Sequence, residues 1–152
     1  MKNLIWPGLI FLVFVASWVV GGWLQNGNDA HYQMMSIPPC DPATIQCTAS
    51  FSDATLAIKF TAPVMVMKPF TVSVETDAAL SSLHLMFQMK NMDMGMQRYA
   101  LEQNKRGQWL TDVVLPVCSL GRSDWTLTLE TEYKNSVWRG DLDFSAASLS
   151  NY

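Results

Sequence analysis

Seven short segments of alternating or β-branched residues constrain the fold of this chain more than any other feature. They are rich in Val, Leu, Thr and aromatic residues, and turn-forming Pro, Asp, Asn and Gly separate them. Segments of this kind, following one another at short intervals, are typical of an all-β sandwich. The predicted strands are 55–61, 70–76, 82–89, 98–103, 108–116, 125–133 and 137–144.

About seven strands in a domain of about 100 residues indicate an immunoglobulin-like β-sandwich, which we place at residues 51–152. Successive side chains of a strand point to opposite faces, so the alternation also predicts which of them face the core. In the segment 82–89 the predicted inward side chains are Leu83, Leu85, Phe87 and Met89. The predicted outward side chains are His84, Met86 and Gln88.

An apolar run without charged residues extends from Leu4 to Leu24. A helix over this run would be about 31 Å long, enough to cross the hydrocarbon core of a bilayer. We therefore predict one N-terminal transmembrane signal-anchor at residues 1–24, with a cleaved signal peptide as the alternative. Residues 25–50, rich in Asn, Pro, Ser and Thr, are predicted to form a linker.

The charges beside this run predict the compartment. Lys2 precedes it, whereas the twenty residues after it contain Asp29 and no Lys or Arg. The positive-inside rule then places the N-terminus in the cytoplasm and residues 25–152 outside it. The expected location is a bacterial-type inner (plasma) membrane, with the domain in the periplasm or otherwise outside the cytoplasm.

Three cysteines in an oxidising compartment allow one disulfide. Cys40 and Cys47 are close in sequence, around a turn-forming "DPAT", and we predict that they pair. The alternative is a disulfide between Cys47 and Cys118. If Cys40 and Cys47 pair, Cys118 is either a small buried residue or a thiolate ligand.

Composition and motifs argue against two classes of function. The net charge of −3 provides no basic surface for phosphates, so nucleic acid is not an expected partner. The sequence has no H-E-x-x-H, G-x-S-x-G, P-loop or G-x-G-x-x-G motif, and we expect no enzymatic activity. Asp141 and Asp143 alternate on a predicted strand and are interpreted as part of a solvated sheet face, and Arg98 and Tyr99 as ordinary strand residues.

Half of the ten methionines lie between positions 86 and 96, close to one of the two histidines. Thioether sulfur is a soft donor that favours Cu(I), and imidazole binds copper as well. The predicted ligands of a copper site are His84, Met86, Met92, Met94 and Met96, with Met89 and Cys118 as further candidates. The same methionines could instead fill gaps in a core or bind a partner protein. A weaker group, His31, Met34 and Met35, is interpreted as part of the tether.

The pair His84-x-Met86 with methionines downstream resembles the sites of periplasmic copper chaperones that deliver Cu(I) to cytochrome c oxidase. A small, membrane-anchored sandwich is also similar to CopC/YtkA-like domains. The resemblance implies a membrane-anchored copper-binding protein, a Cu(I) chaperone whose partner is an apo-cuproprotein or an oxidase assembly factor. The alternative function is a non-enzymatic assembly or scaffold subunit whose Met-rich ribbon binds a partner protein.

Overall fold

The computed structural model describes residues 15, 17, 32–92, 95–118 and 121–147. The chain divides into two compact units, residues 1–31 and residues 32–152. Of the predicted anchor, only Val15 and Ser17 are described, both as helical, and the rest of it lies outside the described residues. Within the described residues, no helix has both the length and the apolar character needed to cross a bilayer.

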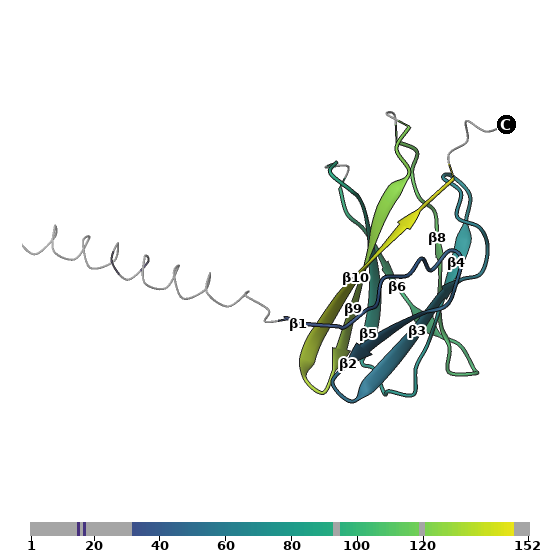
Figure 1. The fold of residues 1–152 in the computed structure, drawn as a ribbon. Helices are drawn as coiled ribbons and strands as arrows, with labels where there is room; N and C mark the ends of the chain where they lie inside the picture. The colour runs from purple at the N-terminus through teal and green to yellow at the C-terminus, as the bar shows by residue number, and fades with distance from the viewer. Residues whose placement is uncertain (1–14, 16, 18–31, 93–94, 119–120, 148–152) are drawn as a thin grey trace, which may run out of the picture. The chain divides into compact units, whose positions relative to one another are not determined.

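The described residues between 32 and 147 form two β-sheets of five strands each. Figure 1 shows this all-β arrangement, which confirms the predicted all-β sandwich. The strand order is β1-β10-β9-β5-β6 in the first sheet and β2-β3-β4-β8-β7 in the second. The strands are β1 (Tyr32–Met34), β2 (Cys47–Phe51), β3 (Ala54–Phe60), β4 (Phe70–Glu75), β5 (Ser82–Met89), β6 (Gln97–Ala100), β7 (Glu102–Gln103), β8 (Trp109–Val113), β9 (Asp124–Tyr133) and β10 (Ser136–Ser145).

The core lies between the two sheets and is built from the inward residues of each strand. In β5 the inward set Leu83, Leu85, Phe87 and Met89 is buried, as the alternation predicts. Phe87 stands at the centre, with ring centroids 6.3 Å from Phe70 of the opposite sheet and 6.0 Å from Phe144 of its own. This aromatic group joins the two layers.

Both sides of the sandwich are closed by a segment that passes from one sheet to the other. The predicted strand 98–103 is divided at Leu101 into β6, which pairs with β5, and β7, which pairs with β8. On the other side, β1 runs parallel to β10, and Ser36 then exchanges backbone hydrogen bonds of 2.8 and 2.9 Å with Ser50 of β2. Such crossings cover sheet edges that would otherwise offer unpaired backbone groups.

Strands β1 and β2 occupy part of the range that the sequence indicated as linker, so the folded unit begins earlier than position 51. The sequence pattern did not indicate either strand, for different reasons. β1 has only three residues, all of them exposed. β2 alternates between buried and exposed residues, but its inward set includes Cys47 and Ala49, which carry little apolar signal.

The predicted disulfide is present. Cys40 and Cys47 form a disulfide, which excludes the alternative pair of Cys47 with Cys118. Cys118 is a buried free thiol. The disulfide closes a loop that Asp41 also holds, because its carboxylate accepts a hydrogen bond of 2.9 Å from the backbone N–H of Ala43.

The turns of two hairpins are joined by an ion pair. The Lys134 ammonium, in the β9–β10 turn, donates to both carboxylate oxygens of Asp53, in the β2–β3 turn, at 3.0 and 2.8 Å. This hydrogen bonding lowers the pKa of Asp53 from 3.8 to about 2. Because the pKa is lower in the folded chain, the pair stabilises the fold above pH 4, and its contribution is lost as the pH falls through 2.

We expect Lys134→Met to return the pKa of Asp53 toward 3.8, because the substitution removes the largest cause of the shift. Carboxyl-carbon NMR during a pH titration measures it. Lys105→Met, in the turn before β8, is the matched control and should leave Asp53 unchanged. A pKa of Asp53 that stays near 2 in Lys134→Met would contradict the assignment.

Candidate metal site

His84 and Met86 lie on the outward face of β5, as predicted, between β6 and β9 of the first sheet. His84 is paired with Glu130 of β9 on one side and with Ala100 of β6 on the other. His84 is partly exposed. Met86 is only 6% exposed, although it does not belong to the core cluster between the sheets.

Arg98 explains why an outward methionine is buried. Arg98 is the β6 partner of Met86, yet its guanidinium donates a hydrogen bond of 2.8 Å to Glu130 of β9. Since β5 lies between β6 and β9, the Arg98 side chain must cross β5 to reach Glu130. Its aliphatic part therefore covers Met86, as long basic side chains often do.

A second arginine reaches the same carboxylate from β10. Arg139 donates to Glu130 at 2.6 Å, and its guanidinium also lies over the Tyr32 ring, 3.9 Å from the centroid. Two guanidinium groups thus surround one carboxylate beside His84, and the local charge is positive. A metal cation bound at His84 and Met86 would be repelled by this charge.

The loop after β5 brings soft donors together at one end of the sandwich. Asn91 adopts a left-handed backbone conformation (φ 55°) that ends the strand. Met92 then turns toward the core, and its Sδ lies 3.5 Å from Sγ of Cys118, which belongs to the segment after β8. In Figure 1 the segments that follow β5 and β8 lie at the same end of the sandwich.

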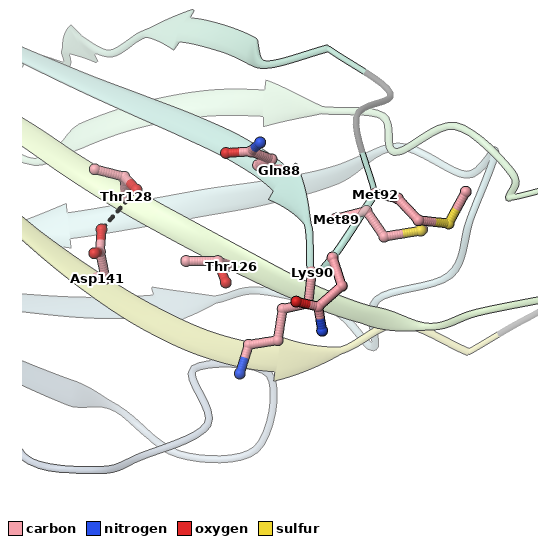
Figure 2. Close-up of a pocket in the computed structure, with 8 residues that line it drawn as sticks. Gln88, Met89, Lys90, Met92, Thr126, Thr128 and Asp141 are labelled. Atoms are coloured by element: carbon pink, nitrogen blue, oxygen red, sulfur yellow. Dashed lines mark hydrogen bonds between the residues drawn. The ribbon is translucent and has the colours of Figure 1, made fainter.

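A groove of about 570 Å³, lined in part by Met92, opens near the end of β5. Figure 2 shows Thr128 and Asp141 toward one end of it, with the Thr128 hydroxyl donating to Asp141 at 2.6 Å. Met89 and Met92 extend toward the other end, and their thioether groups point the same way. The groove therefore has a polar floor on the outward face of the sheet, whereas the Met89 side chain itself is buried in the core.

The remaining predicted ligands are placed as follows. Met96 precedes β6 and is 58% exposed. Met94 lies outside the described residues, as does His31 of the weaker group. Met34 is exposed on β1, whereas Met35 is buried in the core cluster. The structure thus brings Met92 and Cys118 together, places Met89 in the core cluster, and leaves His84 and Met86 on the outward face of the sheet, where Met86 is buried.

The neighbours of the cluster have structural roles. Asp141 and Asp143 are outward on β10 and accept hydrogen bonds from Thr128 and Thr126, which agrees with a solvated face. Tyr99 packs against Phe87, and its hydroxyl donates to the Val114 carbonyl at 3.0 Å. Across the described ranges, no group of three His, Cys, Asp or Glu side chains is arranged to hold a metal ion.

Sequence reasoning did not anticipate the Arg98–Glu130–Arg139 cluster. The sequence does place the three charged residues on predicted strands. Whether Arg98 lies opposite Glu130 across β5, however, depends on the register of the strands. Turns and strand pairing set that register, and a single sequence does not specify them.

No protein-family model matches the chain, and no curated protein matches it. Among solved structures, the chain is similar to one described as "Crystal structure of Br derivative BhCBM56", at 12% sequence identity and a TM-score of 0.43. That similarity covers 64% of this chain and 97% of the other. It assigns the chain to no family.

Proposed function

We propose that this chain is a membrane-anchored, extracytoplasmic copper-binding protein that holds Cu(I) at its Met-rich loop and passes it to an apo-cuproprotein, such as a respiratory oxidase under assembly. The observation that carries the proposal is the 3.5 Å approach of Met92 Sδ to Cys118 Sγ at the base of the loop. Thioether and thiolate sulfur favour Cu(I) over hard cations. The Met-rich loop is the segment 90–96 between β5 and β6. Met94 and Met96 follow Met92 in this loop and would supply further thioethers.

The transfer of copper follows from the chemistry of these ligands. Neutral thioethers bind Cu(I) without losing a proton, so they can be exchanged one at a time for the ligands of a recipient protein. Met96, which is exposed, is the natural first contact for such a recipient. His84 and Met86 form a secondary donor pair, which becomes accessible only if Arg98 leaves Glu130.

We infer an immunoglobulin-like sandwich, because the order β3-β4-β8-β7 in one sheet and β5-β9-β10 in the other corresponds to strands ABED and CFG of that fold. The transmembrane helix at residues 1–24 would hold this domain outside the cytoplasm, where a disulfide such as Cys40–Cys47 persists.

The alternative function is an assembly or scaffold subunit that binds a partner protein and no metal. Four large apolar side chains favour this alternative, because they are exposed to solvent at the end of the sandwich that carries the Met-rich loop. A backbone hydrogen bond of 2.8 Å from the Met67 N–H to the Leu115 carbonyl links the segment of Met67 to that of Val114 and Val117. The four are Met67, Met96, Val114 and Val117. Exposed apolar groups of this kind often mark protein contacts.

A Cu(I) titration tests the copper-binding proposal. The full chain, purified in detergent, is titrated with Cu(I) against a competing chelator in ascorbate, which keeps the copper reduced without cleaving the disulfide. We expect the triple variant Met92→Leu, Met94→Leu, Met96→Leu to bind Cu(I) at least about tenfold more weakly than the wild type, because it removes three donors.

Met67→Leu is the matched control, since it changes an exposed methionine at the same end of the sandwich outside the Met-rich loop. It should bind Cu(I) as the wild type does. Equal affinity of the wild type and the triple variant, or no measurable binding by either, would reject the copper site. The scaffold alternative instead predicts that the triple variant keeps its function, because leucine preserves apolar surface.

A further inference from the structure

We propose that Cys118 provides the anionic ligand of the Cu(I) site, in a three-sulfur arrangement with Met92 and Met89 at the base of the Met-rich loop. This inference rests on the proposed copper-binding function and makes it more specific. It makes the Cys118 thiolate the central ligand of that site.

The positions of the three sulfur-bearing residues support a common site. Cys118 and Met92 come from different segments, 26 positions apart, and their sulfur atoms are 3.5 Å apart. Met89 belongs to the same buried cluster as Cys118, and Met92 packs against that cluster. In Figure 2 the Met89 and Met92 side chains extend in the same direction.

The spacing is close to what one bound ion requires. Metal–sulfur bonds in proteins are about 2.3 Å long, so two sulfurs bound to one ion at an angle of about 120° lie about 4.0 Å apart. Opening the Cys118–Met92 distance from 3.5 Å to this value requires a small movement. Methionine has three rotatable side-chain bonds and can make that movement without displacing the backbone.

Burial explains why the thiolate matters. Cys118 is 4% exposed and Met89 is 1% exposed, so an ion bound by these side chains is largely removed from water. With thioethers alone, the complex would keep the full positive charge of Cu(I) in this environment, which is costly. With Cys118 the thiol releases its proton to solvent as the Cu–S bond forms, and the complex is neutral.

The surrounding charges are compatible with a neutral complex. Arg122 and Asp124 form an ion pair near the segment of Cys118. The pKa of Arg122 is raised mainly by its hydrogen bond to Asp124, and to a lesser degree by the charge of Cys118. The Arg122–Asp124 pair is neutral as a whole and adds no net charge near this segment.

Two measurements on the full chain in detergent test the inference. We expect the wild type to develop a thiolate-to-Cu(I) charge-transfer absorption in the ultraviolet as it binds Cu(I) in ascorbate. We expect Cys118→Ser to lose this absorption and to bind Cu(I) at least about tenfold more weakly, because the anionic donor is gone. Met67→Leu should retain both properties.

The outcomes separate this inference from the proposed function. If the wild type binds Cu(I) without the charge-transfer absorption, or if folded Cys118→Ser binds as tightly as the wild type, the role of Cys118 is rejected while copper binding stands. If the wild type does not bind Cu(I), the proposed function itself fails. Circular dichroism checks the fold of Cys118→Ser, and if that variant is unfolded the wild-type spectrum decides.

Discussion

Phe87→Ala is expected to lower the free energy of unfolding by about 3–5 kcal/mol, the range for truncating a buried aromatic side chain. Phe87 is fully buried and packs edge-on against aromatic rings of both sheets, Phe70 and Phe144, and against Tyr99. The cavity would therefore open between the two layers, where neighbouring side chains of paired strands cannot easily collapse into it. Urea denaturation followed by tryptophan fluorescence measures the change.

The adjacent residue is the control for this substitution. Gln88 is on the same strand but is exposed on the outward face. Gln88→Ala should change the free energy of unfolding by no more than about 0.5 kcal/mol, as surface substitutions usually do. Similar losses for the two variants would show that β5 does not divide its side chains between core and surface as described.

Much of the fold was predictable because it depends on a local pattern. In β5, β9 and β10 apolar residues alternate with polar ones, and this period of two defines both the strand and its buried face. The division of 98–103 into β6 and β7 was not predictable. It depends on where Leu101 meets β5 and the opposite sheet, which is a tertiary effect.

The candidate site was predictable in composition but not in arrangement. The sequence identified the methionines between 86 and 96 as soft donors, and an extended chain would have placed them in a row. The turn at Asn91 instead directs Met92 inward to Cys118, which is 26 positions away in sequence. Contacts over such separations are set by the packing of the whole sandwich and leave no mark on the local pattern.

The outward pair His84 and Met86 illustrates the same limit in another way. Alternation correctly assigned their face, but not the Arg98 side chain that covers Met86. A donor on the right face of a strand is accessible to a metal only if its cross-strand neighbours leave it open. Those neighbours come from β6 and β9, and only the structure defines the register of these strands relative to β5.

Removal of the disulfide is the second large effect that we expect. The double variant Cys40→Ala, Cys47→Ala should lose about 2–3 kcal/mol of unfolding free energy, chiefly because the unfolded chain is no longer constrained by the short loop. Loss of the buried Cys47 side chain from β2 adds to this. Denaturation by urea, with and without dithiothreitol, measures the loss.

Dithiothreitol serves as the internal control. It should lower the stability of the wild type toward that of the double variant and leave the double variant unchanged, because Cys118 has no disulfide to reduce. If the reductant destabilises the double variant as well, the effect does not come from the Cys40–Cys47 disulfide. If the double variant is as stable as the oxidised wild type, the prediction is wrong. The hydrogen bonds of Asp41 would then be sufficient to hold the loop before β2, and the disulfide would contribute little to the free energy of unfolding.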